Sequence, residues 1–287
     1  MLLRAVDAVI ESDYADFELI IVDQSGDDRT RAALAPMLND ARVRYVHSSM
    51  RGKGLALNRG LAEAKAEIVA CTDDDCIVAS DWIGTIVAAF ARSPAVAVIF
   101  GTVDAGPHDG STGYIPTYRP AKEHLATSIL DDVWVRGLGA SMGLRRSAIE
   151  RIGGFDPALG PGSRFGAGED WDIAARALLG GFAVLELPGA RVIHEGFRSF
   201  QDGRDHARRD WYGIGMMCAK PLRRGYWRAL VVAARLVAGR ALFPPLRDIA
   251  HLRRPSGLMR IAAFTQGFAR GLRAPLQRDA LAFDLEP

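Results

Sequence analysis

Residues 67–76, EIVACTDDDC, place an apolar run directly before three consecutive carboxylates. A second run of this kind, FELIIVD, occupies residues 17–23 and also ends in polar residues. Short continuous apolar runs that end in polar loops are typical of strands buried on both faces of a parallel sheet. We therefore predict two buried strands whose acidic carboxyl ends share one edge, the edge where α/β sheets bind ligands.

The pattern alternates between helix and strand on both sides of these runs. Apolar residues recur at helical spacing in several segments, and β-rich runs lie between them. The predicted helices are 1–12, 30–38, 55–65 and 80–92, and the further strands are 43–47 and 95–103. This alternation indicates an α/β domain with a mostly parallel sheet flanked by helices. The Gly- and Pro-rich residues 104–135 form an unusually long predicted loop, and short strands and helices return at 137–203.

Composition excludes several protein classes. The chain has 287 residues, 49% of them hydrophobic and 24% charged, and three cysteines. These values are typical of a globular protein and do not fit a disordered chain or a disulfide framework. No run of about 18 uncharged apolar residues occurs, so we predict no transmembrane helix. The first residues lack the apolar core of a signal peptide, which predicts a cytoplasmic protein.

Charge divides the chain into two parts. Residues 219–278 contain thirteen Lys and Arg and a single acid, Asp248. We predict an α/β domain over 1–203 and a basic, mainly helical extension over 204–287, with helices near 226–242 and 258–272 separated by Pro244-Pro245 and Pro255. Arginines and aromatic residues interspersed in apolar stretches favour peripheral contact with an anionic membrane rather than a nucleic acid. A helical cap packed on the acidic domain is the alternative.

Two acidic groups could carry chemistry. Asp73, Asp74 and Asp75 repel one another, and a hard cation such as Mg²⁺ or Mn²⁺ would offset that repulsion. A solvated acidic turn is the alternative. Glu169 and Asp170 follow a glycine-rich loop and begin a predicted helix, where the helix dipole favours a carboxylate. A carboxylate there can act as a general base on a hydroxyl group.

Basic and imidazole side chains supply further candidates. His194 lies in the strand-like run ARVIHEG and is a metal ligand only if the fold brings it to the acidic loop. Arg51, Lys53 and Asn58 lie in MRGKGLALNRG, where basic residues beside glycines lead into a helix and suit a phosphate. The spacing is not that of a P-loop. The cysteines that flank the acidic loop lack the further ligands of a zinc site.

Together these segments resemble the family 2 glycosyltransferases of the GT-A fold. The matching segments, in chain order, are ELIIVDQSGDD, RGKGLALNRGL, CTDDDCIVASDWI, the stretch 139–181 and VIHEG. The match covers roughly residues 1–200. It implies a Rossmann-like sheet, a nucleoside-diphosphate-sugar donor, and inverting transfer to a saccharide or lipid-linked acceptor. It also implies work at the cytoplasmic face of the membrane in surface-polysaccharide or glycolipid assembly.

The resemblance implies a role for each matching residue. Asp170 would deprotonate the acceptor hydroxyl, with Glu169 in support. Asp75, with Asp73 and His194, would hold Mg²⁺ or Mn²⁺ on the diphosphate. The implied donor-binding residues are Asp23, Gln24, Arg51, Lys53, Asn58, Asp73 and Asp74, and the implied acceptor-binding residues are Ala140, Ser141, Met142 and Trp171.

The chain departs from the family pattern in two places. Gln24 stands where many relatives have an acid that reads uracil, which weakens a uracil assignment and leaves a guanine or thymine nucleotide open. The family's first strand, which lies between the strands predicted at 17–23 and 67–75, is absent. We expect the chain to be N-terminally incomplete, with two buried strand edges left unpaired.

An inactive scaffold and a sugar nucleotidyltransferase are the alternative classes of function. A catalytically inactive, transferase-like scaffold would explain the absent strand. A sugar nucleotidyltransferase shares the α/β architecture and metal use, but its glycine-rich, basic N-terminal loop is not present.

Overall fold

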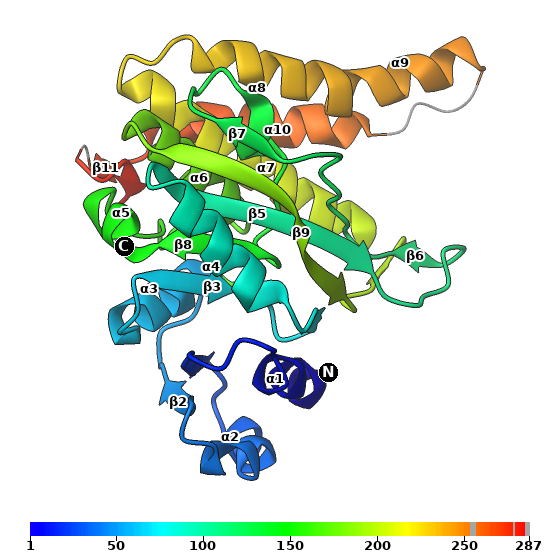
Figure 1. Cartoon of the computed structure of the whole chain (residues 1–287). Coiled ribbons are helices and arrows are strands. Elements are labelled where there is room, and N and C mark those ends of the chain that lie inside the picture. The colour runs from blue at the N-terminus through cyan, green and yellow to red at the C-terminus, as the bar shows by residue number, and fades with distance from the viewer. Residues whose placement is uncertain (253–256, 278, 285–287) are drawn as a thin grey trace.

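The computed structural model describes residues 1–252, 257–277 and 279–284 and has a mixed α/β fold (Figure 1). Its main sheet has six strands, in the spatial order β3–β8–β5–β9–β4, with β7 added beside β9. These strands are β3 (Ile68–Cys71), β4 (Cys76–Val78), β5 (Val96–Ala105), β7 (His124–Ala126), β8 (Met142–Arg145) and β9 (Ala183–His194). The two long strands, β5 and β9, form its centre.

The central pair is parallel, and β4, β7 and β8 run opposite to it. β3 is antiparallel to β8 and therefore runs in the same direction as the central pair. β5 and β9 pair from Val96 opposite Ala183 to Ala105 opposite His194. β3, β4, β7 and β8 all pair antiparallel with their neighbours. The predicted α/β class is confirmed, and the prediction of parallel strands holds for this central pair. The antiparallel additions are not encoded by apolar runs, which report burial but not strand direction.

A small N-terminal layer lies at one end of the molecule (Figure 1). Its elements are α1 (Leu2–Ile10), β1 (Leu19–Asp23), α2 (Arg29–Leu34), a 3-10 turn at Met37–Asn39 and β2 (Val43–His47). β1 pairs in parallel with β2, and within the described residues it does not pair with β3. The expected separation of these two strands is confirmed. Their edges differ from the expectation in being half-buried, so water can satisfy the unpaired backbone groups.

Helices cover the sheet and form its C-terminal layer. Around the sheet lie α3 (Lys53–Glu63), α4 (Trp82–Arg92), α5 (Arg146–Arg151) and α6 (Glu169–Leu179). The C-terminal layer contains α7 (Gly203–Arg223), α8 (Ala229–Val237), a π turn at Ala238–Leu242, α9 (Phe243–Ala250) and α10 (Leu258–Arg273). The predicted loop 104–135 contains β6 (Gly113–Tyr114), β7 and a 3-10 turn (Asp132–Val135). β6 pairs with β10 (Arg198–Ser199). Near the C-terminus, β11 (Leu276–Gln277) pairs with β12 (Ala282–Phe283).

The C-terminal helices share the core of the α/β domain. α7 begins at Gly203, at the predicted boundary, but its buried Trp211, Met216 and Met217 join the same apolar cluster as the sheet and α6. α7 packs closely on α10. The absence of a side chain at Gly267 allows this approach, because a Cβ there would collide with the Tyr212 backbone. The alternative of a helical cap therefore describes α7 and α10 well.

One long helix crosses the top of the molecule (Figure 1). Ala229–Ala250 forms a 22-residue helix whose most apolar 18-residue window has a mean hydropathy of 1.5. The helix is long and apolar enough to cross a membrane by length and composition alone. Arg235 and Arg240 interrupt its apolar residues, which is why no such helix is expected from uncharged runs. Pro244-Pro245 does not separate helices as predicted, because both prolines lie at the start of α9, directly after the π turn, and the helix continues through them. Pro255 lies outside the described residues.

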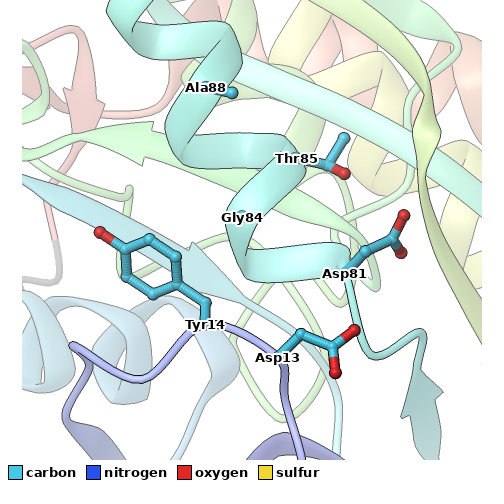
Figure 2. A pocket seen from close by; sticks show the side chains of 6 residues that line it. All are labelled: Asp13, Tyr14, Asp81, Gly84, Thr85 and Ala88. Carbon is cyan, nitrogen blue, oxygen red and sulfur yellow. The ribbon is translucent and has the colours of Figure 1, made fainter.

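A surface hollow of about 310 Å³ lies beside α4 (Figure 2). Its lining residues are Asp13, Tyr14, Asp81, Gly84, Thr85 and Ala88. Asp13 already accepts a hydrogen bond from the Ser80 hydroxyl at 2.6 Å. No residue predicted for the functional site lines this hollow, so it is distinct from the site described next.

Candidate active site

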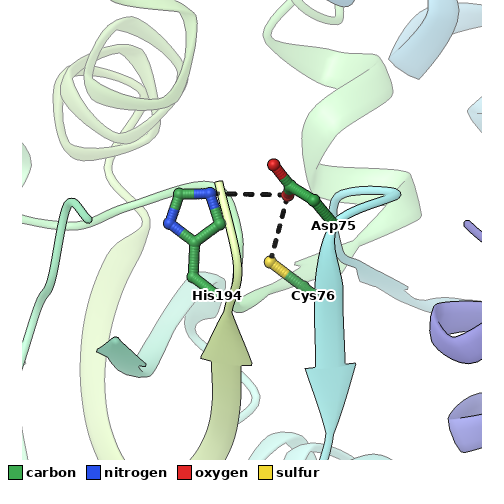
Figure 3. A group of neighbouring side chains, drawn as sticks. All are labelled: Asp75, Cys76 and His194. Atoms are coloured by element: carbon green, nitrogen blue, oxygen red, sulfur yellow. Dashed lines mark hydrogen bonds and ion pairs between the residues drawn. The ribbon is translucent and has the colours of Figure 1, made fainter. Parts of the chain in front are cut away.

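Strand pairing brings the acidic loop and the predicted histidine together. Cys76 begins β4 directly opposite His194, the last residue of β9. The His194 Nε2 atom lies 3.4 Å from Asp75 Oδ1, and the Cys76 thiol donates to the same oxygen at 3.7 Å (Figure 3). One ligand atom of each residue lies within 4.8 Å of the others. The condition placed on His194, that the fold bring it to the acidic loop, is met.

The chemistry of this group suits a hard or borderline divalent cation. Burial together with Asp73 and Asp75 raises the pKa of the Cys76 thiol, so the thiol stays protonated and is a poor ligand. An imidazole nitrogen and a carboxylate oxygen remain, a donor set that accepts Mn²⁺ or Mg²⁺ with further oxygens from a substrate. A Cβ at Gly196 would collide with both Asp75 and His194. The glycine therefore keeps space open beside both ligand atoms.

The contact between Asp75 and His194 shifts the pKa values of these two candidate ligands in opposite directions. The contact with His194 lowers the pKa of Asp75, although burial works against this. Burial lowers the pKa of His194, but the Asp75 contact outweighs it and the pKa is raised. Asp73, the other predicted metal ligand, lies with Lys53 instead, as the next cluster shows.

Lys53 joins the donor-side and acceptor-side carboxylates. Its Nζ atom lies 2.6 Å from Asp73 Oδ1 and 3.8 Å from Glu169 Oε1. Burial opposes the charge on the amine, but Asp73, Glu169 and Asp170 together raise the pKa of Lys53. These residues come from the start of α3, the loop after β3 and the start of α6. The structure thus brings together three segments that are predicted separately from the sequence.

Asp170 is held rigidly at the N-terminus of α6. Its Oδ2 accepts a hydrogen bond from the Gly139 amide at 3.0 Å, and its Oδ1 accepts one from the Trp171 amide at 2.8 Å. Burial raises the pKa of Asp170, and Lys53 and the two amides oppose that effect. Burial and the neighbouring Asp170 raise the pKa of Glu169 to about 7. Such carboxyls are stronger proton acceptors than exposed ones.

The end of β1 forms a further polar group. Asp23 Oδ2 accepts hydrogen bonds from the Tyr45 hydroxyl at 2.7 Å and the Ser25 hydroxyl at 2.8 Å. Burial opposes ionisation of Asp23, but these bonds and the Ser25 amide lower its pKa. Gln24 donates to the carbonyls of Met50 and Gly52, so its amide fixes the loop that precedes Lys53.

Other predicted residues have structural contacts. Asn58 exchanges two hydrogen bonds with the Phe155 backbone, at 2.8 and 2.7 Å, and clamps α3 to the loop after α5. The Ser141 hydroxyl is fully buried, accepts from Trp82 Nε1 and donates to a backbone carbonyl.

The remaining predicted site residues differ in how far they are buried. Met142 and Ala140 are buried, so their side chains face the interior. Arg51 and Asp74 are exposed. Although Asp74 is exposed as a residue, partial desolvation of its carboxyl group, together with the charges of Asp75 and Asp73, raises its pKa.

Trp171 connects the site to the C-terminal layer. Its indole N–H donates to the Gly137 carbonyl at 2.7 Å, and the Arg240 guanidinium lies 5.8 Å from its ring centroid. The contributions of Arg240, Tyr45 and Gly196 are absent from the sequence prediction. The His194–Glu195–Gly196 succession is the one local signal that could have indicated a glycine beside a ligand.

The fold matches solved glycosyltransferase structures. S. aureus TarS in complex with UDP-GlcNAc aligns with a TM-score of 0.64 at 13% identity, covering 98% of this chain and 80% of that one. The mannosyltransferase PcManGT from Pyrobaculum calidifontis, in complex with GDP-Man and Mn²⁺, aligns with a TM-score of 0.62 at 18% identity, covering 94% and 83%. The class defined by this architecture is the GT-A glycosyltransferase fold.

The family follows from the sequence itself. The model for glycosyl transferase family 2 matches residues 1–153, and the chain belongs to this family. A relative in Nostoc sp., an uncharacterized glycosyltransferase named alr2836, is 27% identical over 161 residues. That alignment covers 54% of this chain and 50% of the relative, so the chain spans about half the length of this relative. The predicted family and fold are confirmed.

Proposed function

We propose that the protein is a metal-dependent, inverting glycosyltransferase that moves a sugar from a nucleoside diphosphate to an acceptor hydroxyl. The observation that carries the proposal is the Lys53 bridge between Asp73, in the acidic loop, and Glu169, beside Asp170. Through this bridge, the donor-side carboxylate of Asp73 and the acceptor-side pair Glu169–Asp170 lie on either side of one lysine amine. Membership of family 2 supports the same activity.

The reaction needs one base and one stabilised leaving group. The acceptor oxygen attacks the anomeric carbon, the bond from that carbon to the diphosphate oxygen breaks, and the acceptor proton passes to Asp170. The two amide hydrogen bonds keep the Asp170 carboxylate in place for this step. Asp75 and His194 would hold Mg²⁺ or Mn²⁺, whose charge stabilises a departing diphosphate. Lys53, whose amine lies beside Asp73, would add positive charge near the same diphosphate.

The donor base stays open between uracil, guanine and thymine. Asp23, Tyr45 and Gln24 offer both hydrogen-bond donors and acceptors, and the two solved neighbours carry UDP and GDP sugars. On the acceptor side, a hollow of about 470 Å³ is lined by Phe165, Arg209 and Tyr212 among others, close to α6. Aromatic rings and hydrogen-bonding side chains suit a saccharide. We propose a saccharide or lipid-linked acceptor in surface-polysaccharide or glycolipid assembly at the cytoplasmic face of the membrane.

The test is a transfer assay with UDP-, GDP- and dTDP-sugars, each with Mn²⁺, Mg²⁺ or EDTA. Donor binding is followed separately by the rise in melting temperature that a ligand of the native state causes. We expect one donor to stabilise the protein only with metal, and EDTA to remove both stabilisation and turnover. Asp170→Asn should reduce turnover by about 10³-fold or more while donor binding persists.

Asp7→Asn, the same change at an exposed position on α1, is the control and should keep full turnover. Unchanged turnover in Asp170→Asn would contradict the assigned base. Absence of any donor-dependent stabilisation in the folded protein would favour the inactive scaffold.

A further inference from the structure

The helix Ala229–Ala250 has an unusual outer face. Its inner face is buried against the neighbouring helices and contains Ala229, Val232, Ala233, Leu236, Ala241 and Pro245. A surface helix normally presents charged or polar residues on the opposite side. Here that side contains large apolar residues that are 40–61% exposed, namely Leu230, Val231, Leu242, Phe243, Leu246 and Ile249.

The π turn keeps these exposed residues on one side. An α-helix turns 100° per residue, so apolar positions in two successive helices drift apart around the axis. The π turn at Ala238–Leu242 contains one extra residue and resets that drift by about one position. Exposed apolar residues therefore follow one line from Leu230 in α8 to Leu246 in α9. Trp227 extends the line before α8, and it is 68% exposed.

Positive charge surrounds this apolar face. Arg224, Arg228, Arg235 and Arg247 are all exposed on or beside the helix. The single acid of residues 219–278, Asp248, is buried on the inner side. An apolar strip with aromatic residues and arginines, without exposed acids, has the chemistry of a surface that rests among anionic lipid headgroups.

The packing distinguishes a helix on the membrane from one that crosses it. One third of the most apolar window is buried inside the protein. A spanning helix would have to leave its contacts with α7 and α10 and carry Arg235 and Arg240 into hydrocarbon, which is costly. Lying flat needs neither change.

We infer that the outer face of residues 226–250 binds the surface of an anionic lipid bilayer. Figure 1 shows this helix along one side of the molecule, with α9 extending beyond the sheet. Arg240, within the π turn, lies over Trp171, the neighbour of Asp170. The docked helix therefore brings the bilayer toward the acceptor side of the site. This orientation, unlike the binding itself, rests on the proposed function.

The test is flotation of the full-length protein with preformed vesicles of phosphatidylcholine alone or with 30% phosphatidylglycerol. We expect binding to the anionic vesicles only, with release in high salt. Phe243→Gln with Leu246→Gln should reduce the bound fraction by about tenfold, because both side chains lie on the outer face. Arg224→Gln with Arg228→Gln should reduce it similarly by removing headgroup attraction. Leu3→Gln, the same change at an apolar residue of α1 that is 41% exposed, should have no effect.

A second readout does not depend on flotation. Of the five tryptophans, Trp82, Trp134 and Trp211 are buried, Trp171 is half-buried and Trp227 is 68% exposed. Anionic vesicles should therefore shift the fluorescence to shorter wavelength mainly through Trp227. Trp227→Phe should abolish the shift while the protein still melts cooperatively. Absence of binding to anionic vesicles would overturn the inference, as would retention on vesicles through alkaline carbonate extraction. Lipid-independent dimers that Phe243→Gln/Leu246→Gln disrupts would also overturn it. Transfer to a soluble acceptor, measured in the same variants, separates failure of docking from failure of the proposed activity.

Discussion

Lys53 is the residue through which the two acidic groups of the site influence each other. Its charge lowers the pKa of both Glu169 and Asp170, whose burial raises them. Removing that charge should therefore raise the pKa of the base. We expect Lys53→Met to move the acidic limb of the kcat/KM profile to higher pH and to lower the plateau by about 10²-fold.

Lys53→Arg keeps the charge and should leave the limb near its wild-type position. Lys122→Met, an exposed lysine away from the site, is the matched control. A pH–rate profile for Lys53→Met that superimposes on the wild-type profile would exclude this coupling.

Glu169 links stability to pH. Its pKa rises from 4.5 to about 7 on folding, so the folded chain binds this proton more tightly than the unfolded chain does. The stabilisation from this group is fully present below pH 4.5 and is lost as the pH rises through 7. Urea unfolding at pH 5 and pH 8 should show a loss on the order of 2 kcal/mol that Glu169→Gln removes. Glu11→Gln, at an exposed carboxyl, should retain the full pH dependence.

Gly196 tests the cation site without replacement of a ligand. A methyl group there would collide with Asp75 and His194 and displace their ligand atoms. We expect Gly196→Ala to weaken Mn²⁺ binding by about tenfold or more, measured by calorimetry, with little change in melting temperature. Gly110→Ala introduces the same methyl group where nothing lies within 4 Å and should bind Mn²⁺ normally. Equal Mn²⁺ affinity in the two variants would place the cation elsewhere.

Elements with strong periodicity are predicted well from the sequence, and the remainder depend on tertiary contacts. The strand 43–47 is reproduced at both ends as β2, and the helix 80–92 is found as α4. The 21-residue helix α7 is missed, because its glycines, clustered arginines and internal Pro221 obscure the apolar repeat. β4 is missed because three residues carry no period, and pairing with β9 alone defines it.

The site divides in the same way. The acidic loop, the Glu169–Asp170 pair and His194 are each visible as local patterns. Their association depends on pairings such as Cys76 opposite His194, between residues more than one hundred positions apart. The structural contacts of Asn58 and Ser141 also depend on the fold, since each side chain donates a hydrogen bond to a backbone carbonyl far away in the sequence.

α7 is attached to the α/β domain by buried charge. Lys220 Nζ lies 2.5 Å from Asp156 Oδ2 and 2.6 Å from Asp172 Oδ1, and all three side chains are at most 1% exposed. Arg176 completes the group through Asp172. Lys220→Met leaves carboxylates without their partner in the core, which costs about 3–5 kcal/mol. Chemical denaturation should show this loss, whereas Lys65→Met at an exposed lysine should change stability by less than about 0.5 kcal/mol. A loss below about 1 kcal/mol for Lys220→Met would mean that this cluster does not hold α7.

One apolar core continues across the predicted domain boundary at residue 203. Apolar residues of α7 and α10 belong to the same cluster as β5 and α6. A chain ended at residue 203 would expose that cluster and lose the partner of Asp156 and Asp172. We expect it to lack a cooperative thermal transition and native near-ultraviolet circular dichroism. A soluble 1–203 fragment with both properties would establish two independent domains.

The Asp156 carboxylate also accepts the backbone N–H of Phe283 at 2.8 Å, so a loop on the acceptor side is tied to residues more than 120 positions later. Synthesis on the ribosome proceeds from the N-terminus, and the sheet emerges well before α10 and β12. Throughout that interval Asp156 lacks Lys220 and then Phe283, so the loop has only its bonds to earlier residues, such as the pair between Asn58 and the Phe155 backbone. Completion of this side of the site therefore waits for the synthesis of Lys220 and Phe283, whatever else of the chain has already been made.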